Sequence, residues 1–400
     1  MSPTDGLPRT RYESPFVRTT ALLAGSSPGK PPIDLGVGEP RHPIPSFVAP
    51  TLAANVADFG RYPPIRGTDR FRQAVANWAD RRFGLGGMID PATMVLPLNG
   101  SREGLFLAAI AARRYLDKPT TRPVVLLPNP FYQAYSAGAD VAGAEIVTIA
   151  PAGTHTAIPD LTPLRGDLLE RTIAIYIASP ANPQGTAATL DDWLRIFTLA
   201  RRFRFFVFAD ECYSELYRGS NAPTGALEAA KETGSLDLLV SFNSLSKRSN
   251  LPGLRVGHAI GDPAFLAEWT KFRNMAAPQV PLPLQEVAAA ALDDELHVLE
   301  NRNLYDQKFA AAEKRLGRRF PNLTPAGGFF LWLDVSGYGD GELVARALWR
   351  LQGLRVIPGG YLCTAGPDGV NPGTGYIRLA LVDDLDLTIT ALDRIAEFFG

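Results

Sequence analysis

The sequence predicts an α/β protein with a large, doubly wound, mostly parallel sheet domain and a smaller α+β domain. Two observations support this prediction. Short apolar runs alternate with helical stretches between about residues 95 and 262, as repeated strand–helix units do. Beyond a proline cluster near residue 280 the pattern changes to a long helix, followed by strands mixed with helices. A length of 400 residues is ample for two domains.

The expected strands of the large sheet are rich in β-branched, aromatic and other apolar residues. They lie at Val124–Leu127, Thr172–Ser179, Phe205–Phe208, Leu238–Phe242 and Leu254–Ile260. Nearly continuous apolar character is typical of strands that are buried on both faces of a parallel sheet. Helical stretches at Glu103–Leu116 and Leu190–Phe203 separate the strands, as a doubly wound sheet requires.

The domain boundaries follow from composition. Residues 1–45 are rich in proline and glycine, and we expect them to form an N-terminal arm and part of the small domain. Residues 46–284 form the predicted large domain, and residues 285–400 an interdomain helix and the small C-terminal domain. One apolar helix face comprises Val298, Tyr305, Phe309, Ala312 and Leu316. The small domain has expected strands at Phe329–Val335 and Tyr376–Val382 and helices at Leu343–Leu351 and Leu385–Phe399.

Composition excludes several classes of protein. Hydrophobic residues make up 46% and charged residues 20% of the chain, as in ordinary globular proteins. A net charge of −1 argues against a nucleic-acid binder, which normally carries a basic excess. Two cysteines, Cys212 and Cys363, cannot form a disulfide framework and fit a reducing, cytoplasmic compartment. No apolar run approaches the ~18 residues needed to cross a membrane.

Common catalytic motifs are missing from the sequence. The four histidines (His42, His155, His258 and His297) lack the spacing of metal ligands, so no metal site is expected. The chain also contains neither a GxSxG nucleophile elbow nor a GxGxxG dinucleotide fingerprint.

The most informative segment surrounds Lys247. We expect Lys247 on a loop at the carboxyl end of a strand, where open α/β sheets bind ligands. A lone lysine is usually a solvated surface residue. Here Ser244 and Ser246 precede Lys247 and Arg255 follows it eight residues later. This group could cradle a phosphate while presenting an amine.

Polar residues also follow other predicted strands. Asp210 ends a buried run, although a single aspartate there is as often a cap or turn residue. Asn182 lies in a proline-flanked turn that could be only a tight connection. Gly100, Ser101 and Arg102 lead from a strand into a helix, where backbone N–H groups face any anion; taken alone, this is an ordinary helix start.

Taken together and in this order, these segments resemble the pyridoxal-phosphate enzymes of the aspartate aminotransferase fold, known as fold type I, class I/II. The resemblance spans nearly the whole chain and includes Gly36–Pro40, Tyr62, Pro130–Tyr132 and Arg378. Longer stretches resemble the bacterial succinyldiaminopimelate aminotransferase family, which acts in lysine and cell-wall biosynthesis: residues 38–43, 129–132, 210–217, 244–255 and 301–305.

The resemblance implies pyridoxal 5′-phosphate as the cofactor and a role for each residue around its ring. Lys247 would be joined to the cofactor aldehyde and, once freed, would move the substrate proton. Asp210 would accept a hydrogen bond from the ring nitrogen, which keeps the ring cationic. Asn182 and Tyr213 would bind the phenolic oxygen of the ring. Tyr132 would lie against the ring face, although it could equally be a core aromatic residue.

The resemblance also implies a phosphate site and a shared active site. The expected phosphate-binding residues are Gly100, Ser101, Arg102, Ser244, Ser246 and Arg255. Tyr62 resembles the tyrosine that reaches the phosphate from the neighbouring subunit. We therefore expect a homodimer with shared active sites.

The substrates implied by the resemblance are amino acids and 2-oxo acids, with glutamate as the amino donor and 2-oxoglutarate as its product. Gly38, Asn182 and Arg378 would bind the α-carboxylate, although an arginine opposite an apolar strand face could be merely solvated. A long acidic substrate needs a second cationic or polar group. The candidates are Arg41, Arg66, Arg102 and Arg248, and the sequence does not choose among them.

Two alternatives remain at this point. One is another enzyme of the same fold: an aromatic, aspartate or LL-diaminopimelate aminotransferase, or a carbon–sulfur lyase. The other is a regulator that uses the fold to sense a ligand. Such regulators carry a DNA-binding domain before the fold, for which we expect no room because Gly38 already belongs to it.

Overall fold

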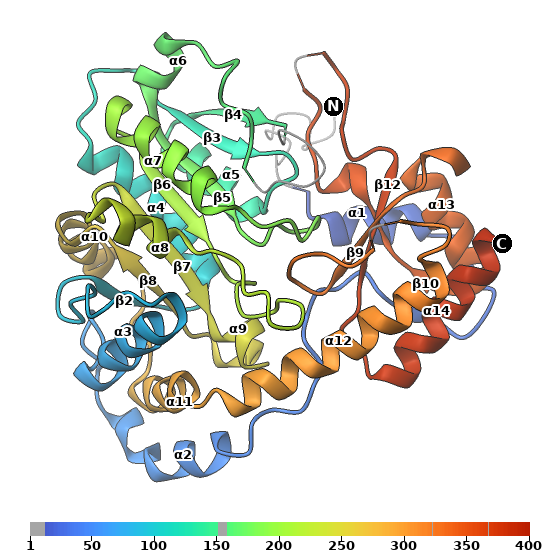
Figure 1. Ribbon diagram of the computed structural model, residues 1–400, viewed down its shortest axis with the longest axis horizontal. Coiled ribbons are helices and arrows are strands. Elements are labelled where there is room, and N and C mark those ends of the chain that lie inside the picture. Colours follow the sequence, from blue (N-terminus) through green and yellow to red (C-terminus); the bar gives the residue numbers. More distant parts are fainter. Residues whose placement is uncertain (1–12, 151–157, 322, 367) are drawn as a thin grey trace, which may run out of the picture.

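A computed structural model describes residues 13–150, 158–321, 323–366 and 368–400. These residues form a large unit around a seven-stranded sheet and a smaller unit around a three-stranded sheet. The long helix α12 (Leu296–Leu316) runs from the large unit to the small one (Figure 1). The first twelve residues of the expected N-terminal arm lie outside the described part of the chain.

The large sheet is mixed, with most neighbouring strands parallel. Its strands run in the order β2 (Val95–Leu98), β8 (Gly257–Gly261), β7 (Leu239–Ser244), β6 (Phe206–Asp210), β5 (Thr172–Ala178), β3 (Val124–Pro128) and β4 (Glu145–Ile149). β8 is antiparallel to both of its neighbours, β2 and β7, and the other neighbouring pairs are parallel. This architecture confirms the predicted fold class.

The predicted strand Leu254–Ile260 begins too early. Pro252–Leu254 forms a short 3₁₀ turn, and Arg255 has a left-handed φ of 57°. Neither conformation belongs to a strand, because strand residues have negative φ and proline cannot donate to the ladder. The strand therefore starts at Gly257.

Side-chain alternation along the strands creates an apolar core on each face of the large sheet. In β6, Phe206 and Phe208 face one side and Val207 and Ala209 the other. The first face is covered by α4 (Ser101–Tyr115), α5 (Gln133–Val141) and α10 (Pro263–Ala276). The second is covered by α3 (Asp69–Phe83), α7 (Leu190–Phe203), α8 (Ala226–Thr233) and α11 (Leu282–Asp293). Shorter helices are α2 (Val48–Ala54), a 3₁₀ helix (Val56–Gly60), α6 (Gly166–Arg171) and α9 (Leu245–Arg248).

The small unit combines chain from both ends of the sequence. Its antiparallel strands run in the order β11 (Ile357–Pro358), β12 (Tyr376–Ala380) and β9 (Phe330–Asp334), and β1 (Ile33–Asp34) pairs in parallel with β10 (Leu354–Arg355). Its helices are α1 (Pro15–Leu23), α13 (Gly341–Ala347) and α14 (Leu385–Phe399), with 3₁₀ turns at Ser336–Tyr338 and Gly359–Tyr361. The predicted helix Leu343–Leu351 is α13 continued by a π-helical turn over Leu348–Gln352.

Helices α11 and α12 mark the junction of the two units. The predicted boundary between residues 284 and 285 falls inside α11, whose Val287 and Leu292 belong to the core of the large sheet. The predicted apolar face of α12 is buried, and its C-terminal half, including Phe309 and Leu316, joins the core of the small unit. The junction therefore consists of α11 in the core of the large unit, followed directly by α12, which ends in the core of the small unit.

A buried ion pair fixes the start of α4, which lies beside the pocket described below. Arg273 of α10 is buried; its Nε and Nη2 donate to the Glu103 carboxylate at 3.0 and 2.9 Å, and its Nη1 donates to the Pro97 carbonyl at 2.7 Å. Removing one partner of a buried pair leaves an uncompensated charge away from water.

We therefore expect Glu103→Gln to destabilise the protein by about 3 kcal/mol, because the Arg273 guanidinium loses its counter-charge. Denaturant-induced unfolding measures this loss. Glu268→Gln is the matched control, since it breaks a surface pair with Lys271 at 2.6 Å, and should cost less than about 1 kcal/mol. Equal losses in the two variants would contradict the prediction.

Candidate active site

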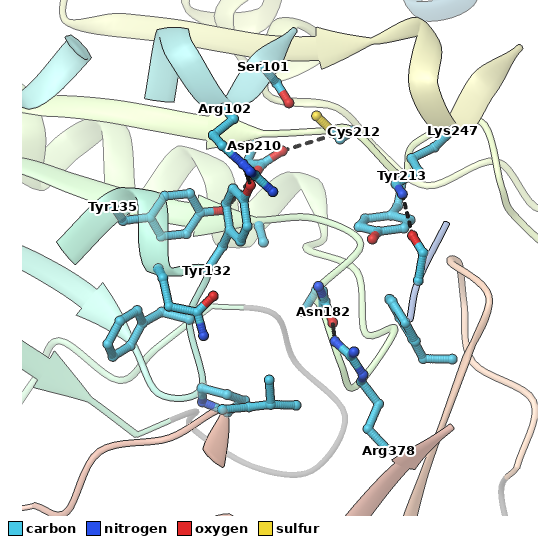
Figure 2. Close-up of a pocket in the computed structure, with 18 of the residues that line it drawn as sticks. Ser101, Arg102, Tyr132, Tyr135, Asn182, Asp210, Cys212, Tyr213, Lys247 and Arg378 are labelled. Atoms are coloured by element: carbon cyan, nitrogen blue, oxygen red, sulfur yellow. Dashed lines mark hydrogen bonds between the residues drawn. The ribbon is translucent and has the colours of Figure 1, made fainter. Parts of the chain in front are cut away.

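A pocket of about 410 Å³ opens where the parallel strands of the large sheet end. Ala178 of β5, Asp210 of β6 and Ser244 of β7 line it from the large unit. Phe330 and Arg378 line it from the small unit, and Figure 2 shows Arg378 there. Open α/β sheets bind ligands at the carboxyl ends of their strands, so this pocket is the candidate active site.

Asp210 is a buried carboxylate that lines the pocket. Tyr135 Oη donates to its Oδ2 at 2.5 Å, and the Cys212 N–H donates to its Oδ1 at 3.2 Å. Burial raises the pKa of Asp210, and the two hydrogen bonds partly oppose that rise. Within the described ranges, no lysine, arginine or histidine forms an ion pair with this carboxylate. Asp210 is therefore suited to a cationic N–H group supplied by a ligand.

Lys247 lies on the short helix α9 (Leu245–Arg248) and not on the predicted loop. Its Nζ donates to the Gly38 carbonyl at 2.6 Å. Burial lowers the pKa of Lys247 to about 8, and the charges of Arg378 and Arg102 contribute to the decrease. At pH 7 about a tenth of such an amine is neutral. The pocket thus holds a lysine that is much easier to deprotonate than a surface lysine.

An anion cradle lies at the start of α4. The first backbone N–H groups of a helix have no partners within the helix, and Ser101 opens α4 at the pocket wall. Ser244 and Ser246 line the same pocket with their hydroxyl oxygens 2.9 Å apart, and so does Arg255. Gly100 does not line the pocket, but its φ of 76° and lack of a side chain let Arg255 approach: a Cβ there would lie 2.3 Å from Arg255 Nη2.

These three features fit pyridoxal 5′-phosphate. The readily deprotonated amine of Lys247 suits the cofactor aldehyde, and the unpaired buried carboxylate of Asp210 suits the ring nitrogen. Hydroxyls, a guanidinium and a helix N-terminus suit a phosphate with nearly two negative charges. A side chain at position 100 would fill the place now taken by the guanidinium of Arg255.

The predicted ring-binding residues also line the pocket. The Tyr132 hydroxyl accepts a hydrogen bond from Arg102 Nε, and its ring packs edge-on against Tyr135 with centroids 5.7 Å apart. Tyr213 packs edge-on against Phe329 at 5.4 Å. Asn182 is in direct hydrogen-bond contact with Arg378 (Figure 2). All of these side chains line the pocket that also contains Lys247 and Asp210, and their roles toward a cofactor ring stay predictions.

Arg378 is buried, so the alternative of a solvated arginine is wrong. Its Nη2 donates to the Gly36 carbonyl at 2.7 Å and its Nη1 to Asn182 Oδ1 at 3.3 Å. Its guanidinium lies 4.4 Å from the centre of the Phe330 ring, and its Nε is buried without a partner. Burial lowers the pKa of Arg378 to about 10, so the group is still charged at neutral pH. No described carboxylate pairs with it, which leaves it free to bind one from a ligand.

Of the four arginines considered for a distal carboxylate, only Arg102 lines the pocket. Arg41 pairs with Asp383, and Arg66 donates to a backbone carbonyl. Arg248 is buried; it bonds Glu295 at 2.6 Å and a backbone carbonyl of α11, also at 2.6 Å. The sequence could not exclude these three, because their partners lie far away in the chain.

Tyr62 does not line the pocket of its own chain. It lies on the segment between the Val56–Gly60 3₁₀ helix and α3, and its side chain is 96% exposed. Its expected role toward a neighbouring subunit stays a prediction.

Tyr135, Cys212 and Phe330 also line the pocket, although they are not among the residues predicted from the sequence. Tyr135 follows the predicted Tyr132 by three residues, so both point from the start of one helix toward the same place. Cys212 follows Asp210 by two residues, in the turn after β6, where an aspartate side chain commonly accepts a hydrogen bond from the backbone N–H two residues on. These spacings could have identified both. Phe330 comes from the small unit, and no local pattern links it to the pocket.

The described residues contain neither a candidate metal site nor a membrane-spanning helix. In those ranges no group of histidine, cysteine and acidic side chains could hold a metal ion. His155, one of the four histidines considered above, lies outside them. No helix in the described part of the chain is both long and apolar enough to cross a membrane.

Several proteins that are similar to this chain are named aminotransferases. LL-diaminopimelate aminotransferases of Aquifex aeolicus and Nitratidesulfovibrio vulgaris (strain Hildenborough) are 30% and 31% identical to this chain, over 91% of it and 90% and 91% of the relatives. A crystal structure of an aminotransferase from Neisseria meningitidis has a TM-score of 0.91 at 36% identity, covering 97% of this chain and 98% of the other. A probable N-succinyldiaminopimelate aminotransferase from Thermus thermophilus shares the fold, with a TM-score of 0.83 at 24% identity over 96% of this chain and 100% of that one.

The family model for class I and II aminotransferases matches residues 30–393, nearly the whole chain. The matched region contains Lys247, Asp210, Arg378 and the anion cradle. The chain therefore belongs to the class I and II aminotransferases, which use pyridoxal 5′-phosphate to move amino groups between amino acids and 2-oxo acids.

Proposed function

We propose that this aminotransferase acts on a diaminopimelate derivative with two acidic ends. The proposed reaction interconverts N-succinyl-LL-2,6-diaminopimelate and 2-oxoglutarate with N-succinyl-2-amino-6-oxopimelate and glutamate. The observation that supports it is a pair of guanidinium groups, Arg378 and Arg102, that line one pocket. Neither is paired with a carboxylate of the described residues.

Arg378 and Arg102, the two pocket arginines outside the anion cradle, suit substrates with two separated carboxylates. Arginine binds carboxylates through a planar, two-pronged set of donors. Arg378, held by Gly36 and Asn182, would take the α-carboxylate that every substrate shares. Arg102, whose Nε donates to the Tyr132 hydroxyl, would take the distal carboxylate of glutamate or of the longer substrate.

LL-diaminopimelate is a second candidate substrate, because the relatives at 30% and 31% identity are named for it. The two candidates differ in charge at the distal end. LL-diaminopimelate carries a free ammonium there, which the Arg102 charge would repel and the carboxylate of Glu39, another pocket residue, would attract. Succinylation replaces that ammonium with a neutral amide and adds a carboxylate. Arg102 therefore favours the succinylated compound.

The chain's own residues supply the proton transfers. When bound, pyridoxal 5′-phosphate supplies an aldehyde that takes up the amino group and a ring that withdraws electrons from the substrate α-carbon. Lys247 Nζ would remove the proton from that α-carbon, because burial keeps part of the amine neutral at pH 7. Asp210 would hold a proton at the ring nitrogen. Tyr213 and Asn182 would donate hydrogen bonds to the phenolic oxygen.

We expect cofactor attachment at Lys247 to depend on pH with a midpoint near 8. The neutral amine is the nucleophile, so the attachment rate should rise with pH and level off above the lowered pKa of about 8. The measurement mixes cofactor-free protein with pyridoxal 5′-phosphate between pH 6 and 9, reduces it with borohydride, and identifies the modified peptide by mass spectrometry.

Lys247→Ala should abolish that adduct and the transaminase activity. Lys271→Ala, which removes an exposed lysine of α10, should leave both unchanged. A rate that still climbs tenfold per pH unit between pH 8 and 9, as an amine with the ordinary lysine pKa of 10.5 would give, or an adduct on another peptide, would overturn the proposed role of Lys247.

The substrate assignment is tested by half-reactions. The holoenzyme is mixed with N-succinyl-LL-diaminopimelate, LL-diaminopimelate, glutamate, aspartate, phenylalanine or alanine, and the rate of cofactor amination is followed by absorbance. We expect the succinylated compound to react fastest. Cystathionine tests for a carbon–sulfur lyase, which would release pyruvate and ammonia. A faster reaction with phenylalanine or cystathionine would refute the assignment.

The same assay should distinguish the roles of Arg378 and Arg102. Arg378→Ala should lower kcat/KM for every amino acid by about 10- to 100-fold, because each loses a charged hydrogen-bonding partner. Arg102→Gln should lower it by a similar factor for glutamate and the succinylated substrate, but should leave alanine unaffected. A loss of kcat/KM for alanine as large as that for glutamate would show that Arg102 does not bind the distal carboxylate.

A further inference from the structure

A chain of buried polar side chains lies behind the helix that carries Lys247. Lys308 contacts His42, and His42 contacts Asn301. Lys308 and Asn301 lie on α12, whereas His42 belongs to the segment between the two units. None of these residues lines the pocket, and the proposed chemistry uses none of them. Asn301 and Lys308 are 5% and 1% exposed, so burying them needs an explanation.

At one end, this series of hydrogen-bonded side chains reaches the backbone of α9. Asn301 Nδ2 donates to the carbonyl of Lys247 at 3.2 Å and to that of Arg248 at 3.4 Å. The last carbonyls of a helix have no partners within the helix, and α9 is only four residues long (Leu245–Arg248). Asn301 therefore satisfies groups that would otherwise be left buried and unpaired. It also attaches α9 to the interdomain helix.

The hydrogen bonds that link Lys308, His42 and Asn301 can have only one set of donors and acceptors. Lys308 keeps an ammonium group at neutral pH, since burial lowers its pKa only to about 8, and an ammonium has donors alone. His42 Nε2, 2.6 Å from Lys308 Nζ, must then accept. The proton of His42 lies on Nδ1, which donates to Asn301 Oδ1 at 2.6 Å. The Asn301 amide is therefore oriented with its NH₂ group toward α9.

The far end of the chain reaches the small unit. Lys308 Nζ also donates to the carbonyl of Leu381, just beyond β12, at 3.1 Å. Strand β12 carries Arg378, the proposed α-carboxylate ligand. The His42 ring packs against Tyr305 with centroids 4.5 Å apart, which keeps the ring in place between the two units. One polar chain thus connects the backbone of Lys247 with the end of the strand that bears Arg378.

We propose that Asn301 is a positioning residue: oriented by His42 and Lys308, it fixes α9 so that the Lys247 amine points at the cofactor and the substrate α-carbon. The inference rests on the proposed role of Lys247. Asn301 touches neither the substrate nor the cofactor. Its loss should therefore impair steps that need a correctly aimed amine and spare substrate binding.

The test compares two asparagines of α12. Asn301→Asp replaces the NH₂ donor with an oxygen that repels the two carbonyls, whereas Asn303→Asp makes the same change at an exposed position of the same helix. For each holoenzyme we measure kcat, KM for glutamate and the thermal midpoint. For the cofactor-free chain we measure the rate of attachment to Lys247 by borohydride trapping.

We expect Asn301→Asp to lower both kcat and the attachment rate by about 10-fold or more, because a small misplacement of a reacting group is costly. KM should change by less than about a factor of two, since binding contacts are untouched. Asn303→Asp should match the wild type. A folded Asn301→Asp protein with wild-type kcat and attachment rate, or an equal loss in Asn303→Asp, would overturn the proposal.

If Asn301→Asp does not fold, His42→Phe decides, because it keeps an aromatic ring against Tyr305 but cannot orient Asn301. A drop in kcat of about threefold or more with KM unchanged supports the proposal, and wild-type kcat refutes it. The outcome is separable from the proposed function. Trapping at another lysine in the wild-type protein refutes the role of Lys247, whereas trapping at Lys247 with normal Asn301→Asp kinetics refutes only the positioning role.

Discussion

The site depends on two opposite charges that are buried in one cavity without forming an ion pair. Asp210 and Lys247 both line the pocket, and desolvation is the largest influence on the pKa of each. Taking either group out of water is costly, and a direct pair would have reduced that cost. The fold keeps them apart and satisfies them with neutral partners, a tyrosine hydroxyl and a backbone carbonyl. A ligand that is cationic at one end and electrophilic at the other meets both needs, as pyridoxal 5′-phosphate does.

The sequence predicted the parts of the site that rest on local patterns. Asp210 ends one apolar strand and Lys247 follows another, and the carboxyl ends of parallel strands meet at one edge of the sheet. The anion cradle follows from a strand that leads directly into a helix at Ser101. The fold class follows from strands that alternate with helices. In each case a few adjacent residues determine both the element and the position of its side chain.

What the sequence could not predict depends on contacts between distant segments. Arg248 is next to Lys247, yet successive helical residues point about 100° apart, and Arg248 faces Glu295 away from the pocket. The sequence did not show whether Arg102 or Arg41 is a pocket residue, because Asp383, the partner of Arg41, lies far away in the chain. Strand β8 begins later than the predicted strand Leu254–Ile260 because Arg255 adopts a left-handed conformation. The hydrophobic pattern of the sequence does not reveal that conformation.

The carboxylate of Asp210 also governs the thiol beside it. Cys212 lines the same pocket, and burial together with the neighbouring Asp210 charge raises its pKa well above the ordinary value. Thiols attack carbonyl compounds and oxidants as thiolates, and this one stays protonated at neutral pH. The thiol of Cys212 is therefore a poor nucleophile at neutral pH, whereas the lowered pKa of Lys247 in the same pocket leaves part of its amine neutral and nucleophilic.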